Sequence, residues 1–473
     1  MLEDRFLQLI SNHTRVPIAK VVKAIELFEG GATIPFVARY RKDATGNLNE
    51  VQLEAIAEHH TAFAELTARR AYVLDTIGKQ GQLTDALKSA ILECTDQNLL
   101  EDHYLPYKKA KRTKATVARE KGLLPLAEFI WAQAPGDESL EAVAEKFVRA
   151  EKAIASVAEA IEGAKHILAE GVSVDMEARA LVRDRMQKSG NIAAHPTKNC
   201  EGKHTKFEAY YTFSEPVAKI PSHRYLAIHR GVKDGFLRME LALDDAGVIA
   251  ELQGKHLKSP EGEFAPRICE IVEDAYHRLL RPSIENEVLR HVQERADAEA
   301  IRVFRDNAHN LLLSPPAGSM TVIGVDPGLK TGCKLAVIDS TGAFVESATI
   351  FPTPPRNDVE NAENVLLALI AKHAAKAVAI GNGTGSREVA RFIRLTLTKV
   401  RADGVFMVLV NEAGASIYSA SQIARDEFPN LDVTVRGAIS IARRMQDPLA
   451  ELVKIEPRHI GVAAAPIAGP GTV

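Results

Sequence analysis

The chain has 473 residues, of which 46% are hydrophobic and 26% charged, and a formal net charge of −3 at pH 7. A chain of this length is too long for one compact core, so we expect two to four globular domains. No stretch reaches the ~18 consecutive apolar residues of a membrane-spanning helix, and the first residues include acids where a signal peptide has a basic start. We therefore expect a cytoplasmic protein.

The cysteines and the charge balance exclude further classes. Cys94, Cys200, Cys269 and Cys333 lie far apart and form no CxxC pair, which argues against a zinc ribbon or a disulfide framework. The near-neutral charge gives no overall basic surface, so any contact with nucleic acid must come from local clusters.

Helix signals dominate the first three hundred residues. Pro17 in a first turn and Gly30-Gly31 as a stop predict one helix. Apolar residues at spacings of three, four and seven predict a long amphipathic helix from Asn49 to Ile77. Further helices are predicted over residues 122–134, 139–170 and 175–188, separated by glycine or proline.

The pattern changes between residues 207 and 252. Here "FEAYYTF" and "FLRMELALD" predict short strands, because aromatic and alternating apolar residues favour them. A charged helix is then predicted from Ser283 to about Leu313, and Pro315-Pro316 must end it. We place a domain boundary at these prolines.

Beyond the prolines the hydrophobic pattern becomes that of strands. Strands predicted over 321–325, 333–338 and 344–350 are followed by helices and strands in alternation. The order β-β-β-α-β-α-β-α predicts a mixed sheet covered by helices, as in the RNase H-like fold. We therefore predict a multi-domain protein: a helical N-terminal domain over 1–200, a central helical region with short strands and a linker helix over 201–316, an α/β RNase H-like domain over 317–455, and a disordered or non-native tail over 456–473.

Three acids stand where a nuclease of this fold would need them. Asp326 follows the first strand, Glu412 follows the apolar run "VFMVLV", and Asp447 precedes a late helix. Such enzymes use several carboxylates to hold two metal ions ~4 Å apart, and Mg²⁺ prefers oxygen ligands. Each acid also has a structural interpretation: Asp326 opens an Asp-Pro-Gly turn, Asp447 caps a helix that begins with proline, and Glu412 is a solvated acid at a strand end. Both interpretations stay open.

A glycine-rich turn offers a candidate phosphate loop. In "AIGNGTGSREVA" a strand runs into a helix, so free backbone N–H groups could face an anion; the residues are Gly381, Gly383, Thr384, Gly385 and Ser386. The stretch is neither a P-loop nor a GxGxxG motif, and the glycines could be purely geometric. Lys330, beside the first turn of the sheet, is a second candidate phosphate contact or an ordinary surface lysine.

One short segment is strongly basic. "YKKAKRTKATVAREK" contains six candidate nucleic-acid contacts, Lys108, Lys109, Lys111, Arg112, Lys114 and Arg119. Such cations bind backbone phosphates by counterion release, and the nearby Tyr104 and Tyr107 could stack on unpaired bases. A solvated charge run is the alternative. Arg443 and Arg444 lie near Asp447 and would either hold phosphate beside the acids or pair with the acids.

Several of these motifs resemble one protein family. "GVDPGLKTG", "GNGTGSRE", "NEAGASIYSAS" and "ARRMQDPLAELVKI" resemble the YqgF (RNase H-like) domain of the Tex family of bacterial transcription accessory proteins. "IPFVARYRKDATGNLNEVQL", "LEDHYLPYKKAKRTKATVAREKGLLPLA" and "IPSHRYLAIHRG" resemble the Tex N-terminal and central regions. The resemblance implies resolvase-like acids at Asp326, Glu412 and Asp447, but it implies nucleic-acid binding more firmly than hydrolysis. It also implies helix-hairpin-helix elements and a C-terminal OB-fold RNA-binding domain, and this sequence stops before both.

Three functional hypotheses follow. The favoured one is a transcription accessory protein that binds RNA or another nucleic acid, needs no cofactor for binding, and has an RNase H-like domain that does not cleave. The second is a nuclease or resolvase-like phosphodiesterase in which Asp326, Glu412 and Asp447 hold Mg²⁺. The third is a protein-interaction scaffold on RNA polymerase or the ribosome.

Overall fold

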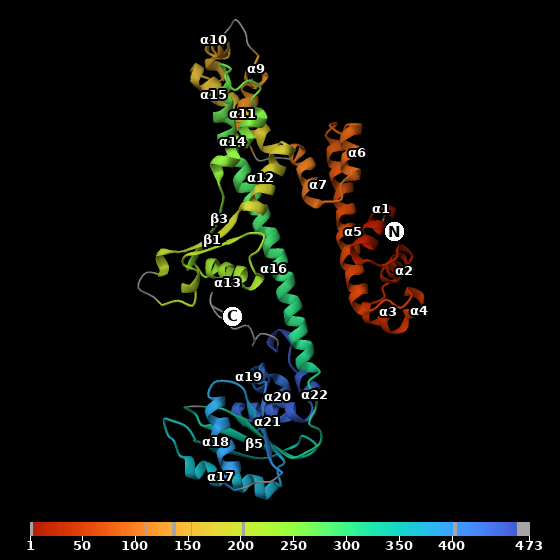
Figure 1. Ribbon diagram of the computed structural model, residues 1–473, viewed down its shortest axis with the longest axis vertical. Coiled ribbons are helices and arrows are strands. Elements are labelled where there is room, and N and C mark those ends of the chain that lie inside the picture. Colours follow the sequence, from red (N-terminus) through yellow and green to blue (C-terminus); the bar gives the residue numbers. More distant parts are fainter. Residues whose placement is uncertain are drawn as a thin grey trace. The chain divides into compact units, whose positions relative to one another are not determined.

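A computed structural model describes residues 3–108, 112–134, 139–152, 154–200, 204–328, 330–400 and 404–460 (Figure 1). The chain divides into two compact units. The first contains Met1–Ile192, Glu215–Lys219 and Glu240–Arg290, and the second contains Ala193–Ser214, Ile220–Met239 and His291–Val473. None of the described helices is long and apolar enough to cross a membrane.

The first hundred residues form a helical bundle around the predicted long helix. This helix, α5 (Glu50–Lys79), begins with a capping box between Asn49 and Gln52 and runs through Gly78 to Lys79. The predicted helix from Asn49 to Ile77 is therefore confirmed, extended by two residues. Its neighbours are α1 (Asp4–Thr14), α2 (Ile18–Glu29), α3 (Ile34–Tyr40), α4 (Lys42–Thr45), α6 (Asp85–Glu93) and α7 (Gln97–Tyr104). Their shared core includes Phe6, Ile10, Ile25, Leu53, Ile56 and Ile77.

The first unit continues with a second group of helices: α8 (Lys114–Glu120), α9 (Leu124–Ala132), α10 (Leu140–Glu145), α11 (Val157–Val174), α12 (Met176–Ser189), α14 (Asp245–His256) and α15 (Ala265–Ala275). The single helix predicted over 139–170 is wrong. It stops at Glu145, an isolated bridge joins Arg149 to Ile154, and the Ser156 side chain accepts a hydrogen bond from Glu159 N–H to start α11.

A three-stranded sheet has the order β2-β1-β3, formed by β1 (Asn191–Pro196), β2 (Phe213–Pro216) and β3 (Leu237–Ala242). The strand predicted in "FLRMELALD" is confirmed as β3. The strand predicted in "FEAYYTF" is wrong for all but its last residue, because Glu208–Tyr210 form a 3₁₀ turn and β2 begins only at Phe213. Helix α13 (Ser222–Lys233) lies between β2 and β3 in the chain.

The predicted charged helix is α16 (Arg281–Leu312), which follows a π-helical turn (Tyr276–Leu280). It ends before Pro315-Pro316, as the sequence predicts.

The mixed sheet predicted after the prolines is confirmed. It contains β4 (Val322–Asp326), β5 (Cys333–Ile338), β6 (Phe344–Ile350), β7 (Ala377–Gly381) and β8 (Phe406–Val410) in the order β6-β5-β4-β7-β8. Strand β4 pairs antiparallel with β5 and parallel with β7, and β7 pairs parallel with β8. Strand β8 is therefore a terminal strand of the sheet, and Phe406, Val408 and Leu409 on it are exposed.

Helices cover both faces of this sheet. One core joins the sheet to α17 (Val359–His373) and α18 (Ser386–Lys399), and the other joins it to α21 (Val433–Gln446). Helix α21 approaches β4 so closely that a Cβ at Gly324 would lie 2.0 Å from the Ala438 carbonyl oxygen. The position of α21 over β4 decides what faces the candidate acids.

The end of the sheet domain holds three short helices, α19 (Ala415–Ala420), α20 (Gln422–Glu427) and α22 (Pro448–Leu452). The single helix predicted in "GASIYSASQIARDEF" is wrong, because the Ser421 side chain accepts from Ala424 N–H and starts α20. The predicted tail begins within described residues at Glu456, where Pro457–His459 form a 3₁₀ turn. Its remainder, 461–473, lies outside the described residues.

Candidate functional site

Two of the three predicted acids come together at one end of the mixed sheet. Asp326 is the last residue of β4, and Glu412 lies two residues after β8. Burial and then the neighbouring Glu412 charge raise the pKa of Asp326 to about 6, while Lys334 acts in the opposite direction. The two carboxylates therefore interact electrostatically.

Strand β7 separates β4 from β8, and glycines in and after β7 let Glu412 reach across it. A Cβ at Gly381 would lie 2.2 Å from Glu412 Oε2, and a Cβ at Gly383 would lie 1.7 Å from Glu412 Oε1. The Glu412 N–H also donates to Asn382 Oδ1 at 3.1 Å. Any side chain at either glycine would displace the carboxylate.

The predicted phosphate loop is thus already filled in part by a carboxylate. Gly385, with φ of +85°, is the residue before α18, and the Ser386 N–H donates back to the Gly383 carbonyl. Ser386 is buried and Thr384 is exposed. Since Gly381 and Gly383 face the Glu412 carboxylate, a phosphate at this turn would meet like charge.

Helix α21 offers backbone, not a third acid, opposite Asp326. A Cβ at Gly437 would lie 2.9 Å from Asp326 Oδ2. Among the residues that the structure describes, no three or more His, Cys, Asp and Glu side chains gather in an arrangement that could hold a metal ion. The acidic site in the described chain is therefore a pair.

Asp447 is not part of this pair. It caps α22, where its carboxylate accepts from Ala450 N–H at 3.1 Å. Ten residues of helix, roughly 15 Å, separate it from Gly437. The neighbouring Gln446 donates to the Met320 carbonyl, just before β4 begins, whereas Asp326 is at the other end of that strand.

The two arginines before Asp447 bind protein groups. Arg444 is buried and its Nη1 donates at 2.8 Å to the carbonyls of Asn411 and Ala413, which flank Glu412. Burial lowers the pKa of Arg444 to about 10, although Glu451 and Glu412 oppose this. Arg444 thus holds the turn that presents Glu412, a role that the sequence pattern did not reveal.

Arg443 is engaged nearby. Its Nε donates to the Gly342 carbonyl and its Nη1 pairs with Glu427, each at 2.8 Å. It therefore pairs with an acid, as the alternative interpretation proposed, but that acid is Glu427 and not Asp447.

The predicted basic segment is exposed where it is described. Lys108, Arg112 and Lys114 face solvent, and Arg112 pairs with Glu120 at 2.9 Å. Arg119 is also exposed and pairs with Glu170. The remaining two candidates, Lys109 and Lys111, lie outside the described residues. Lys330, after β4, is exposed as well.

The two tyrosines beside this segment differ. Tyr104 is only 5% exposed and packs near Tyr72 and the Arg69 guanidinium. Its ring is covered, so it is not available to stack on a base, which was one possibility offered by the sequence. Tyr107 is half-buried.

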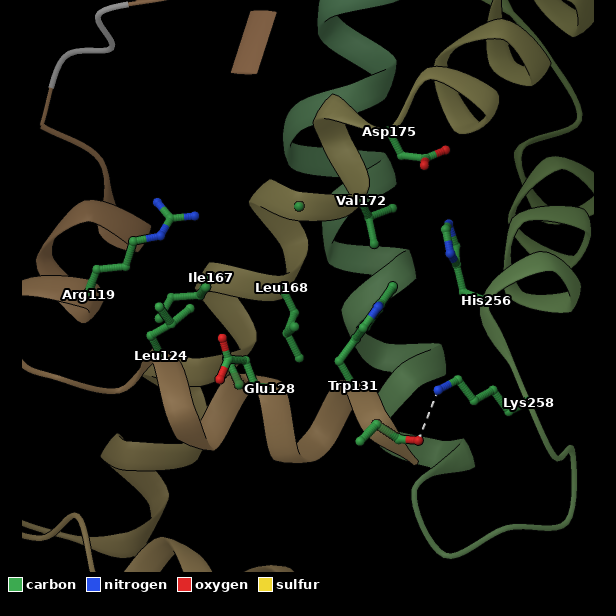
Figure 2. A pocket seen from close by; sticks show the side chains of 13 residues that line it. Arg119, Leu124, Glu128, Trp131, Ile167, Leu168, Val172, Asp175, His256 and Lys258 are labelled. Atoms are coloured by element: carbon green, nitrogen blue, oxygen red, sulfur yellow. Dashed lines mark hydrogen bonds between the residues drawn. The ribbon is translucent and has the colours of Figure 1, made fainter. Parts of the chain in front are cut away.

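A groove of about 600 Å³ lies in the first unit (Figure 2). Trp131 of α9 and His256 have ring centroids 5.4 Å apart beside it, and Lys258 Nζ donates to the Ala132 carbonyl at 3.1 Å. Its lining is largely apolar, with Leu124, Leu168 and Val172 among the residues. An apolar side chain would fit this lining better than a phosphate.

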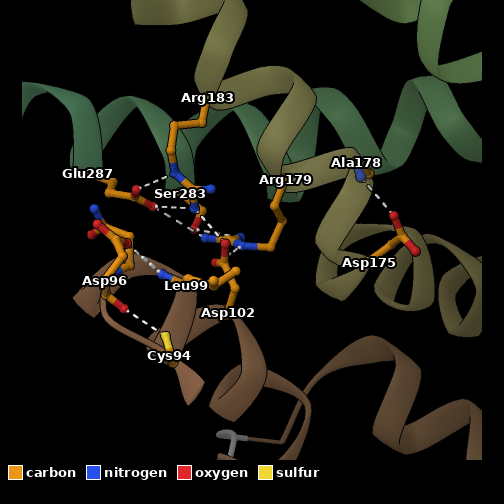
Figure 3. A network of polar contacts seen from close by, with 11 residues as sticks. Cys94, Asp96, Leu99, Asp102, Asp175, Ala178, Arg179, Arg183, Ser283 and Glu287 are labelled. Carbon is orange, nitrogen blue, oxygen red and sulfur yellow. Dashed lines mark hydrogen bonds and ion pairs between the residues drawn. The ribbon is translucent and has the colours of Figure 1, made fainter. Parts of the chain in front are cut away.

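A buried ion-pair network joins three helices of the first unit (Figure 3). Asp102 of α7 accepts from Arg179 at 2.5 Å and from Arg183 at 2.7 Å, both on α12. Arg183 also pairs with Glu287 of α16 at 2.6 Å. Asp102 and Arg179 are each less than 10% exposed, so the network fixes α7 against α12 and α16.

A helical N-terminal region followed by this five-stranded mixed sheet is the architecture of a protein with a YqgF-type domain. Residues 320–446, which contain Asp326 and Glu412, match the Tex protein YqgF-like domain. Residues 137–304 match the Tex central region-like family and 4–78 match the Tex-like protein N-terminal domain. The chain belongs to the Tex family.

Three relatives show how far the similarity extends along the chain. The chain is 42% identical to Protein tex of Bordetella pertussis, over 94% of this chain and 58% of that protein. It is 39% identical to Transcriptional accessory protein Tex of Neisseria gonorrhoeae, over 96% and 60%. It is 34% identical to the human S1 RNA-binding domain-containing protein 1, over 96% and 47%. The chain thus spans about six-tenths of the length of its bacterial relatives.

Proposed function

We propose that this chain is an RNA-binding transcription accessory protein whose RNase H-like domain does not cleave RNA. The printed names of the relatives support the first half, since one is called a transcriptional accessory protein and another an S1 RNA-binding domain-containing protein. Both names belong to longer proteins, so their extension to this chain is part of the proposal.

The observation that carries the proposal is the exposed cationic segment. Lys108, Arg112 and Lys114 lie within seven residues, and Arg112 has Glu120 as an ion-pair partner. An exposed pair of this kind is worth less than about 1 kcal/mol, so a phosphate can replace Glu120 at little cost. Three cations in reach of one strand release counterions when they bind phosphates.

The acidic site supports the second half of the proposal, that the RNase H-like domain does not cleave RNA. Hydrolysis by two metal ions needs several carboxylates around both ions. In the described chain Asp326 has Glu412 beside it, Gly437 opposite it, and Asp447 at the far end of α21. A pair of acids with a glycine opposite provides fewer ligands than that chemistry uses.

RNA binding is tested by fluorescence anisotropy with a labelled U12 oligonucleotide at several salt concentrations. Changing Lys108, Arg112 and Lys114 to Gln should lower the slope of log affinity against log salt by about 2, because each contact on a single strand contributes about 0.7. The matched control changes three other exposed lysines, Lys23, Lys79 and Lys188, to Gln. Equal binding by the wild type and the first variant would refute the assignment of this segment.

The approach of Asp326 to Glu412 favours one alternative, a metal-dependent phosphodiesterase. It predicts cleavage of RNA or DNA that requires Mg²⁺ or Mn²⁺ and is lost in Asp326→Asn. Incubation of purified wild type and variant with labelled substrates and each ion measures this directly. Cleavage that depends on both the metal and Asp326 would replace the non-cleaving proposal.

The remaining hypothesis is that the chain binds a protein partner in the transcription or translation machinery. If the chain is a scaffold on RNA polymerase or the ribosome, the complex should survive nuclease treatment during affinity purification. Loss of all co-purifying protein after nuclease treatment would instead indicate that RNA bridges the complex.

A further inference from the structure

The second unit contains a basic surface that the sequence hypothesis did not use. Its segments 193–214 and 220–239 include seven Lys and Arg against three Asp and Glu, in a chain whose total charge is −3. Helix α13 carries much of this charge. Its residues His223, Arg230 and Lys233 are exposed.

These three residues share one face of the helix. Residues seven and three positions apart lie on the same side because an α-helix has 3.6 residues per turn. The opposite side is buried, with Tyr225 and Ile228 each at most 2% exposed. The helix therefore has a fixed orientation, and its cationic face points to solvent.

The turn after β1 adds cations at the C-terminal end of α13. Thr197 and Asn199 both donate to the Gly235 carbonyl, at 2.7 and 3.0 Å, which places exposed Lys198 beside this end. Lys206 approaches Asp234, the acid that follows α13, with 3.7 Å between Nζ and Oδ2. The negative charge of Asp234 is therefore offset by Lys206, which lies beside it.

The dimensions suit a nucleic-acid strand. Ten residues of helix between His223 and Lys233 span about 15 Å, and a stacked strand has one phosphate per ~3.4 Å. The exposed face can therefore follow about four consecutive phosphates, with Arg230 and Lys233 as its cations and His223 as a hydrogen-bond donor. Cations at the C-terminal end of a helix also interact favourably with the helix dipole, and this applies to Arg230, Lys233 and the nearby Lys198.

We infer that the α13 face, defined by Lys198, His223, Arg230 and Lys233, is a second RNA-binding surface that contacts the phosphodiester backbone of a single strand. This inference rests on the proposed RNA-binding function and adds a site in the second unit. It requires no base-specific contact, so binding at this surface is independent of sequence.

The test changes Lys198, Arg230 and Lys233 to Gln in the full chain and measures affinity for labelled U12 by anisotropy. Three lost contacts predict a salt slope smaller by about 2 and an affinity about a hundredfold lower at 0.1 M salt. The charge-preserving variant, with Lys198→Arg, Arg230→Lys and Lys233→Arg, should bind like the wild type. Circular dichroism checks that both variants remain folded.

A matched control separates this surface from overall charge. Changing Lys372, Arg391 and Lys399 to Gln, all exposed on α17 and α18, removes the same charge elsewhere in the second unit. Equal weakening by the control, or an unchanged slope in the α13 variant while the wild type binds, would overturn the inference alone. A wild type that does not bind U12 at any salt concentration would overturn the proposed function as well.

Discussion

At the scale of single residues, the surroundings of Asp326 disfavour the ionised form of its carboxyl group. Burial and then Glu412 raise its pKa from 3.8 to about 6. Between these pH values the folded state keeps a proton that the unfolded state loses. Stability therefore falls as pH rises from about 4 to 6, and above that the full cost of the ionised carboxylate remains.

Asp326→Asn should therefore stabilise the protein at pH 8. A shift of this size corresponds to about 3 kcal/mol, which we reduce to about 2 because the side chain is partly exposed to solvent. Urea unfolding at pH 8 should show this gain, and at pH 4 the gain should nearly vanish.

Asp447→Asn is the control, since asparagine also caps helices and should leave stability nearly unchanged at both pH values. An equal effect of Asp326→Asn at pH 4 and pH 8 would contradict the assigned cause.

The sequence pattern predicted that the acids lie at strand ends, but not which groups their side chains contact. Asp326 and Glu412 follow apolar strands, so their positions at strand ends were accessible from the pattern. The passage of Glu412 over Gly381 and Gly383, and the placement of Gly437 opposite Asp326, depend on how α21 packs on the sheet. Glu412 is about thirty positions from the two glycines and Gly437 is 111 positions from Asp326, and local periodicity carries no information about either contact.

At the scale of secondary structure elements, two glycines in regular elements differ in the space around them. A Cβ at Gly324 of β4 would lie 2.0 Å from a backbone carbonyl of α21, whereas a Cβ at Gly171 of α11 would have no atom within 4 Å. The first glycine is needed for packing, and the second is not.

Gly324→Ala should lower the free energy of unfolding by about 3 kcal/mol, because backbone must move to admit the methyl group. Gly171→Ala should raise it by about 0.5–1 kcal/mol, since alanine favours the helix and meets no clash. Urea denaturation of both variants measures the two changes. A stabilising Gly324→Ala would mean that α21 does not lie this close to β4.

Elements were predicted well where an apolar pattern ends at glycine or proline, and poorly where it continues across a break. The helices predicted over 139–170 and in "GASIYSASQIARDEF" are each divided before a serine, Ser156 or Ser421, that caps a new helix. Apolar residues continue on both sides of each break, and no glycine or proline lies within it. Periodicity alone therefore joins two helices that a side-chain hydrogen bond separates.

At the scale of the whole molecule, the ion-pair network around Asp102 joins helices that are far apart in sequence. Asp102 is 3% exposed and bonds two arginines of α12. Asp102→Ala would leave both guanidinium groups buried without this partner, so we expect a loss of about 3–5 kcal/mol. Hydrogen exchange should become faster in α7, and urea unfolding should shift to lower concentration.

The exposed pair between Arg185 and Glu251 provides the comparison. Arg185→Gln should change stability by less than about 1 kcal/mol, because solvent screens an exposed ion pair. Similar losses in Asp102→Ala and Arg185→Gln would show that the buried network does not hold α7 in place.

The change from helices to a mixed sheet after Pro316 could be predicted, because the hydrophobic period itself changes there. The Asp102 network could not, because its residues Asp102, Arg179, Arg183 and Glu287 span 186 positions and each resembles an ordinary surface charge in the sequence. The sequence pattern distinguishes the kinds of domain but not the charges that lock helices together.

The terminal strand β8 affects how the protein behaves when concentrated. Within the described residues no strand pairs with its outer edge, and exposed Phe406, Val408 and Leu409 accompany the unpaired backbone groups. Such an edge can recruit the same strand from another molecule and lead to aggregation. Light scattering of concentrated samples should therefore show self-association. Leu409→Lys should suppress it, because a second strand added at this edge would then lie against a lysine charge.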